Sequence, residues 1–282
     1  VAVNADPGAY AWHFQATPED RWDYDSNAQI TLADLTIDGQ QRHVVMHAPK
    51  NGFFYVLDAR TGQFLSGTPW TAQNWTTGID PKTGRPTINP EARYEQTGKL
   101  WVSVPGAGGA HSWQPQSYSP TTGLMYLPAN NAGFPYVAKR DWKPSPLGFQ
   151  TGLDSAATAL PAIQAVRDST MAATTGALVA WDPVRKKEAW RVNYKGPWNG
   201  GTLATAGNLV FQGTATEQFT AYSADSGKQL WTFPTQSGII AAPMTYAIDG
   251  QQYVAVLAGW GGVWDIAPGL LTAKSGFPRN IS

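Results

Sequence analysis

The clearest structural signal in the chain is Ala221-Tyr222-Ser223-Ala224-Asp225-Ser226-Gly227-Lys228-Gln229-Leu230-Trp231. An apolar segment leads into a short polar turn that contains glycine, and a second apolar segment then ends in tryptophan. The Asp225 side chain can accept hydrogen bonds from the turn backbone, and Gly227 can adopt the left-handed conformation that such turns need. We therefore expect two antiparallel strands, with Trp231 on the returning strand filling space between neighbouring sheets.

Similar segments recur along the chain and predict a repeated architecture. Trp190 and Trp231 lie 41 positions apart, and Trp12 and Leu65, which we take as the equivalent positions of two earlier copies, lie 53 apart. A repeat of roughly 40–50 residues with four strands per unit is typical of β-propeller blades. The chain is therefore predicted to be all-β. The related segments are residues 4–12, 57–65 and 180–190.

The final third of the chain shows the repeat most regularly, and it predicts four strands followed by the start of a further blade. In that further blade, residues 239–246 and 253–257 are expected to pair through a hairpin turn at Asp249-Gly250. Residues 117–127 are expected to form a strand, a turn and a strand of an earlier blade. We expect about four blades that belong to a larger ring. The four strands of the regular blade are expected at residues 202–205, 209–212, 219–222 and 229–233.

Two segments interrupt the repeat and are expected to be insertions, near residues 66–100 and 130–176. Both are polar, rich in proline and glycine, and poorly periodic. Within the second insertion, the spacing of Leu160, Ile163 and Val166 predicts a short helix.

Composition excludes several classes of function. The 282 residues are 42% hydrophobic and 14% charged, with 20 basic and 20 acidic side chains, which indicates a folded chain. The chain has no basic run that would favour nucleic acid or an anionic membrane as a partner, and it has no run of 18 apolar residues that would predict a membrane span. The chain has no cysteine, which excludes disulfides, thiolate metal sites and thioether-attached haem within it.

The segment Arg21-Trp22-Asp23-Tyr24-Asp25-Ser26 combines carboxylates and aromatic rings in six residues. On a strand, Asp23 and Asp25 would face one side, with Trp22 and Tyr24 on the other. Two carboxylates on one side repel each other unless a proton or a cation lies between them, and clustered oxygen ligands suit hard cations such as Ca²⁺. The alternative is an Asx-turn whose aspartates are simply solvated.

Several of these segments together resemble one family, the pyrroloquinoline-quinone (PQQ) alcohol dehydrogenases, which are eight-bladed quinoprotein propellers. The repeated turn resembles the tryptophan-docking motif of that family. The resemblance covers residues 1–282 as one partial propeller domain and corresponds to the C-terminal half of the ring. The segments with the most specific resemblance are residues 22–25, 48–58, 197–207 and 259–263.

The resemblance implies roles for individual residues. Asp23 would be the catalytic base, and Lys50 would bind the quinone oxygens and stabilise the negative charge that develops on the cofactor. His111 is more consistent with a structural loop residue than with a metal ligand. The other implied cofactor-binding residues are Trp198, Asn199, Val263, Trp264 and Ser112, the last at a position where the family usually has asparagine.

The resemblance also implies a cation bound by Asp23 and Asp25. In the lanthanide-using branch of the family, an aspartate two residues after the catalytic one adds an oxygen ligand, which suits a trivalent ion. Calcium-using relatives often carry a smaller residue at that position, so Asp25 favours a lanthanide. The rest of this sequence resembles the quinohaemoproteins, which favours Ca²⁺. Both cations remain open.

The resemblance further implies small primary or secondary alcohols as substrates, a cytochrome c-type electron acceptor and a periplasmic location. The other metal ligands of the family lie in the N-terminal half of its propeller, which would have to complete the site. A non-catalytic propeller scaffold or an inactive fragment is the alternative, and a Ca²⁺-binding propeller hydrolase is a weaker third possibility. Because an open half-ring exposes sheet faces, we also expect self-association of the isolated chain.

Overall fold

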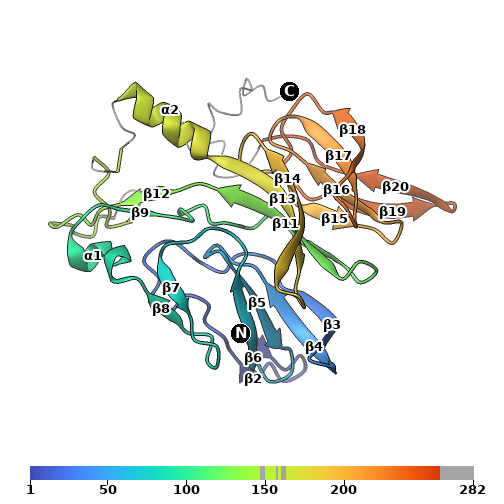
Figure 1. Ribbon diagram of the computed structural model, residues 1–282, viewed down its shortest axis with the longest axis horizontal. Helices are drawn as coiled ribbons and strands as arrows, with labels where there is room; N and C mark the ends of the chain where they lie inside the picture. Colours follow the sequence, from blue (N-terminus) through green and yellow to red (C-terminus); the bar gives the residue numbers. More distant parts are fainter. Residues whose placement is uncertain (147–149, 157, 160–162, 261–282) are drawn as a thin grey trace.

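The computed structural model describes residues 1–146, 150–156, 158–159 and 163–260, and it is built almost entirely from antiparallel strands (Figure 1). Within these residues, three four-stranded sheets have the orders β3-β4-β5-β6, β10-β11-β13-β14 and β15-β16-β17-β18. Each sheet is one blade, so the predicted all-β propeller architecture is confirmed. The strands of the blades are β3 (Thr31–Ile37), β4 (Gln40–His47), β5 (Phe53–Asp58), β6 (Phe64–Pro69), β10 (Ser117–Ser119), β11 (Leu124–Asn131), β13 (Thr175–Asp182), β14 (Lys187–Tyr194), β15 (Thr202–Ala204), β16 (Leu209–Gly213), β17 (Gln218–Ser223) and β18 (Gln229–Pro234).

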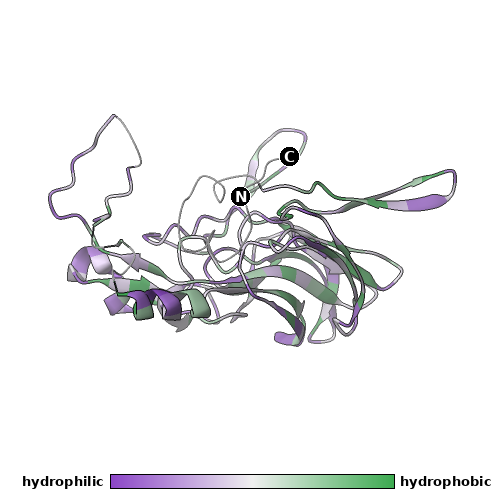
Figure 2. Cartoon of the chain, turned by 90° about the horizontal axis from the view of Figure 1, so that it is seen from above, coloured by the Kyte–Doolittle hydropathy of each residue, from purple (hydrophilic) through white to green (hydrophobic). Residues whose placement is uncertain are grey.

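Two short hairpins flank the three blades. One pairs β1 (Ala2–Val3) with β2 (Tyr10–Trp12), and the other pairs β19 (Met244–Ile248) with β20 (Gln251–Ala255). The second has the predicted turn, in which Asp249 and Gly250 both have positive φ. Figure 2 shows this hairpin projecting beyond the sheets, with hydrophobic strands and a hydrophilic tip. Three blades and two partial ones agree with the expectation of about four.

Tryptophan docking joins neighbouring blades in the same way at two places. The indole Nε1 of Trp12 donates to the Ala59 carbonyl at 3.2 Å, and that of Trp190 donates to the Ala224 carbonyl at 3.1 Å. Three residues after each alanine stands a glycine with positive φ, Gly62 or Gly227. A Cβ on either glycine would lie 2.6 Å from the docked indole, so both positions require glycine.

The blade β3-β4-β5-β6 departs from this pattern, and the equivalence of Leu65 with the docking tryptophans is wrong. Trp190 pairs with Ala180, and Trp231 pairs with Ala221, each just before a β-bulge. At the same place in the β5–β6 pair, Val56 faces Ser66. In all three pairs the partner lies ten positions after the residue that it faces, so Ser66 and not Leu65 occupies the docking position.

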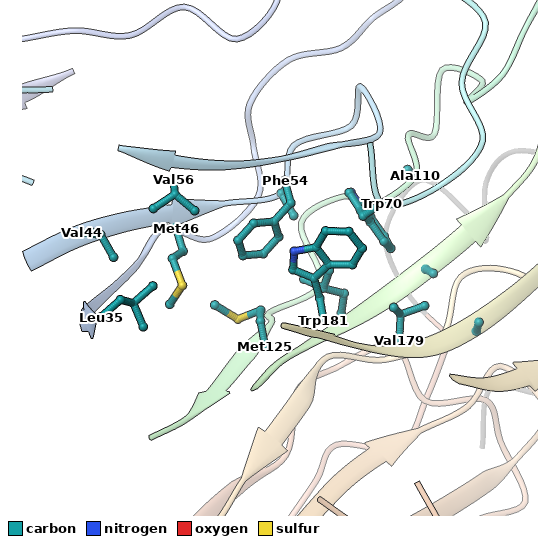
Figure 3. Close-up of a cluster of buried hydrophobic side chains, with 14 residues drawn as sticks. Leu35, Val44, Met46, Phe54, Val56, Trp70, Ala110, Met125, Val179 and Trp181 are labelled. Carbon is teal, nitrogen blue, oxygen red and sulfur yellow. The ribbon is translucent and has the colours of Figure 1, made fainter. Parts of the chain in front are cut away.

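The largest core cluster lies between the first two blades (Figure 3). Met46 and Phe54 from β4 and β5 lie opposite Met125 and Trp181 from β11 and β13, and the Phe54 and Trp181 rings are 6.0 Å apart. The burial of these side chains, at about 25 cal/mol per Å² of apolar surface, stabilises the contact between blades. A second cluster joins the blade β10-β11-β13-β14 to β15-β16-β17-β18.

The two expected insertions contain secondary structure. Residues 66–69 belong to β6, 130–131 to β11 and 175–176 to β13. The insertions also form two separate two-stranded sheets, in which β9 pairs with β12 and β7 pairs with β8. The predicted helix is present as α2, which begins after Ile163; Leu160 lies outside the described residues. Within the described part of the chain, no helix has both the length and the hydropathy needed to cross a membrane. The added elements are β7 (Thr76–Ile79), β8 (Pro86–Ile88), η1 (Pro90–Ala92), α1 (Tyr94–Thr97), β9 (Trp101–Ser103), β12 (Phe134–Tyr136) and α2 (Gln164–Ala173).

Candidate functional site

The segment that carries Asp23 is a loop before β3 and not the strand that the sequence analysis considered. Asp23 has φ +63°, which no strand allows. The reason is local: the Asp20 carboxylate accepts hydrogen bonds from the backbone N–H groups of Trp22 at 2.8 Å and Tyr24 at 2.6 Å, in place of strand pairing. The alternation still holds, because Trp22 and Tyr24 are buried while Asp23 and Asp25 are exposed.

Lys50 lies between the two exposed carboxylates. Its Nζ is 3.1 Å from Asp23 Oδ2 and 2.5 Å from Asp25 Oδ1. The Lys50 side chain is only 9% exposed, whereas those of Asp23 and Asp25 are 66% and 53% exposed. The Lys50 ammonium group therefore supplies the positive charge that two neighbouring carboxylates require, and it is the cationic group that Asp23 and Asp25 contact in this structure.

The turn that carries Lys50 is fixed by its neighbour Asn51. The Asn51 amide donates to the Thr17 hydroxyl at 3.1 Å and to the Tyr55 hydroxyl at 3.0 Å, and its Oδ1 accepts from Phe53 N. The loop at Gly109 packs directly on Lys50, because a Cβ at that position would overlap the lysine side chain. The lysine is thus held from both sides.

A series of three hydrogen bonds, the last of them through the Asn130 side chain, connects Lys50 to Trp198, which lies 148 positions away in the sequence. Ala110 N donates to the Lys50 carbonyl at 2.9 Å, and Asn130 N donates to the Ala110 carbonyl at 2.8 Å. The Asn130 Oδ1 then accepts from Trp198 N at 2.8 Å. On the same loop as Ala110, Ser112 is buried, with its Oγ 3.5 Å from an amide nitrogen of Asn27. Lys50, Ser112 and Trp198 therefore lie on one connected set of loops.

Asn199 is placed differently from the other predicted residues. Its Nδ2 donates to the Gly196 carbonyl and its Oδ1 accepts from Ala215 N, both at 3.1 Å. The Asn199 side chain therefore holds the loop that carries Trp198. Val263 and Trp264, also predicted at the cofactor, lie outside the described residues.

His111 is a buried loop residue, in agreement with its expected structural role. Its Nδ1 and Nε2 each lie 2.7 Å from a backbone carbonyl oxygen, those of Ala48 and Gln114 respectively. Burial lowers the pKa of His111, and the two carbonyls oppose that shift. Both ring nitrogens are occupied by the backbone.

Sequence reasoning missed four residues that fix the Asp23 loop. The Tyr136 hydroxyl donates to the Trp22 carbonyl at 2.6 Å, the Tyr94 hydroxyl donates to the Arg21 carbonyl at 2.7 Å, and the Arg93 guanidinium lies 5.3 Å from the centre of the Trp22 ring. The fourth, Asp20, carried a local signal, since aspartate often caps the N–H two residues ahead. The other three come from β12, α1 and the residue before α1, and no pattern in the sequence connects them to Asp23.

Within the described residues, no group of three or more histidine or acidic side chains is placed to hold a metal. Asp23 and Asp25 provide two oxygen-bearing side chains of the kind that hard cations prefer. Their charges and, above all, burial raise the pKa of the Asp20 carboxyl. These carboxylates thus fit part of a ligand set, and further ligands would have to come from elsewhere.

Comparison with known proteins identifies close relatives over the whole chain. Residues 1–71 and 160–254 match the PQQ family described as "Glucose/ethanol/alcohol dehydrogenase, beta-propeller domain". The dehydrogenase subunit of the quinone alcohol dehydrogenase of Acetobacter aceti is 49% identical over 283 aligned residues, which are 100% of this chain and 38% of that protein.

Solved structures give the same result. The quinohemoprotein alcohol dehydrogenase ADHIIG of Pseudomonas putida superposes with a TM-score of 0.93 at 46% identity, over 97% of this chain and 40% of that one. A europium-containing methanol dehydrogenase superposes with a TM-score of 0.79 at 31% identity, over 96% and 48% respectively. The chain spans less than half the length of these relatives, and it belongs to the PQQ family of glucose/ethanol/alcohol dehydrogenase β-propeller domains.

Proposed function

We propose that this chain supplies one side of the active site of a PQQ-dependent alcohol dehydrogenase. The observation that carries the proposal is the buried Lys50 ammonium, which bridges Asp23 and Asp25 on loops that also connect to Trp198. Because the chain spans 38% of its Acetobacter aceti relative, the remaining part of such a protein would complete the site.

Asp23 is proposed as the base that takes the hydroxyl proton of the alcohol. When bound, PQQ would supply the acceptor for the hydride that leaves the alcohol carbon. The exposed Asp23 carboxylate can reach a substrate, and its Oδ2 lies 3.1 Å from the Lys50 ammonium nitrogen. The ammonium of Lys50 and its three donors also suit the quinone oxygens, where negative charge develops. The buried Trp198 and Ser112 would line the cofactor side of these loops, with Asn199 holding the Trp198 loop in shape.

A cation is proposed to be held by Asp23 and Asp25 together with ligands outside the described residues. Ca²⁺ is the primary proposal, from the resemblance to quinohaemoproteins. A lanthanide ion is the alternative, because the second carboxylate adds negative charge that favours a trivalent ion. In either case a cation would compete with the Lys50 ammonium for the same oxygens.

The proposed physiological setting rests on the resemblance to the PQQ alcohol dehydrogenases. We propose that the substrate is a small primary or secondary alcohol, that the electrons pass to a cytochrome c-type acceptor, and that the reaction takes place in the periplasm. The competing function, a non-catalytic propeller scaffold, gives no reason for a buried lysine to be held between two exposed carboxylates.

Dye-linked alcohol oxidation tests the proposed function. The chain would be assayed alone and after fusion to the additional segments of the Acetobacter aceti relative, with PQQ and either Ca²⁺ or La³⁺. We expect the completed protein to be active and Asp23→Asn to lower kcat at least 10³-fold, because the neutral amide cannot take the proton. The cation that gives activity identifies the metal. Equal activity of the wild-type and Asp23→Asn proteins would contradict the role of Asp23, and an inactive wild-type protein would contradict the function.

A further inference from the structure

We infer that Tyr136 and Asp20 are positioning residues that together hold Asp23 in its left-handed backbone conformation. The inference rests on the proposed function, in which Asp23 must present its carboxylate in one orientation. Neither residue belongs to the segment of residues 21–26 that carries the two carboxylates. Tyr136 lies in β12, so the inference also gives a role to the β9–β12 pair.

The two hydrogen bonds act on the two peptide groups that flank Asp23. The Trp22 carbonyl belongs to the peptide before Asp23, and it accepts from the Tyr136 hydroxyl at 2.6 Å. The Tyr24 N–H belongs to the peptide after Asp23, and it donates to Asp20 Oδ2 at 2.6 Å. The orientations of these two peptides define φ and ψ of Asp23. Fixing both peptides therefore fixes the direction in which the Asp23 side chain leaves the backbone.

Asp23 needs such support because its φ of +63° is unfavourable for a residue with a Cβ. Aspartate tolerates this region better than most residues, but the conformation persists only where its surroundings impose it. Without the two hydrogen bonds, we expect the loop to relax to negative φ. The Asp23 carboxylate would then turn away from Lys50 and from the cation that it shares with Asp25.

Tyr136 is itself rigidly placed. It is buried, its ring stacks on Tyr94 with centroids 5.1 Å apart, and it lies in β12, which pairs with β9. Burial raises the pKa of the Tyr136 hydroxyl, so the group stays protonated and remains a donor. The Tyr94 hydroxyl adds a bond to the Arg21 carbonyl one peptide earlier. The loop is thus held against a fixed aromatic surface.

The first test is Tyr136→Phe, which removes one hydroxyl and keeps the ring. Its matched control is Tyr126→Phe, since the Tyr126 hydroxyl also donates to a backbone carbonyl, that of Ala224 at 2.8 Å, in a different part of the propeller. In the completed, PQQ-loaded protein, we expect Tyr136→Phe to lower kcat about 10- to 100-fold with KM unchanged, in the range that supporting residues of metal sites typically show. Tyr126→Phe is expected to keep the wild-type kcat.

The second test uses Asp20→Asn, because an amide oxygen can replace only one of the two carboxylate oxygens that accept from Trp22 and Tyr24. Asp80→Asn is its control, since Asp80 caps the β7–β8 turn through Lys82 N and Thr83 N. A Tb³⁺ luminescence titration of the PQQ-free protein gives a readout independent of turnover. We expect Asp20→Asn and Tyr136→Phe to weaken Tb³⁺ binding about tenfold, while both controls bind as the wild type does.

The outcomes separate this inference from the proposed function. If Tyr136→Phe and Asp20→Asn match their controls in kcat and Tb³⁺ affinity while Asp23→Asn is inactive, the positioning role is wrong and the function stands. If Asp23→Asn remains active, the proposed function is wrong, and the Tb³⁺ titration alone decides whether Tyr136 and Asp20 position the Asp23 carboxylate.

Discussion

Individual residues near Asp23 differ in how far the sequence could predict them. The spacing of Asp23 and Asp25 was enough to predict a pair of neighbouring carboxylates, whereas Lys50 was added only by the resemblance to the PQQ alcohol dehydrogenases. In the structure, the Lys50 ammonium contacts both carboxylates. Tyr136 lies 114 positions from Trp22, and only the folded chain brings its hydroxyl to that carbonyl. The sequence thus predicts the charged groups but not the residues that hold them.

The burial of His47, at the end of β4, predicts that the free energy of unfolding depends on pH. Burial lowers the pKa of His47 to about 4, below the value of about 6.5 for an exposed histidine. Between these two values the unfolded chain binds a proton that the folded chain does not, so the free energy of unfolding falls as the pH falls from 6.5 to 4. The loss from this residue is about 3 kcal/mol at most.

Thermal unfolding between pH 4 and pH 7 measures this effect. His47→Gln should make the melting temperature depend less on pH, and His111, whose pKa burial also lowers, should account for part of the remaining dependence. His43→Gln changes a histidine whose side chain is 45% exposed and serves as the control. A pH dependence that is the same in His47→Gln and the wild type would contradict the assignment.

At the scale of elements, the strands of the blades were predictable because each combines an apolar run with a turn of known chemistry. The last complete blade and the hairpin after it follow the expected ranges within a few residues. Trp231 follows Gly227 by four positions, and the same spacing from Gly62 gives Ser66, so the choice of Leu65 was one position short. The β9–β12 pair was also not expected, because its strands are short and lie far apart in the sequence.

Tryptophan docking predicts that alanine destabilises the protein more at Gly227, which contacts a docked indole, than at Gly123, which does not. Gly227 and Gly123 have nearly the same φ, +71° and +70°, but a Cβ on Gly227 would lie 2.6 Å from Trp190, whereas a Cβ on Gly123 meets nothing within 4 Å. Gly123→Ala should cost about 1 kcal/mol of stability for the left-handed backbone alone. Gly227→Ala should cost about 2–4 kcal/mol, because it also displaces the docked indole.

Urea denaturation of the two glycine variants measures the difference. Equal losses of stability would mean that the contact between Trp190 and Gly227 does not help to hold the two blades together.

At the scale of the whole molecule, the chain exposes apolar surface on its last blade and on the following hairpin. Leu230, Phe233, Met244 and Ile248 are each more than half exposed, and Trp231, at the docking position of its blade, is 48% exposed. Exposed apolar side chains of this kind favour contact with further protein, and self-association of the isolated chain stays a prediction.

Native mass spectrometry of the completed protein, incubated with PQQ and Ca²⁺ or La³⁺, tests whether Lys50 and the two carboxylates bind the cofactor and a cation. We expect one PQQ and one cation bound together. In Lys50→Gln, PQQ binding should be lost or at least tenfold weaker, because the amide lacks the positive charge that the quinone oxygens and carboxylates share. Lys82→Gln, on the exposed β7–β8 turn, is the control and should bind PQQ normally. A completed protein that binds no PQQ, or a Lys50→Gln variant that binds it as tightly as the wild type, would contradict the account.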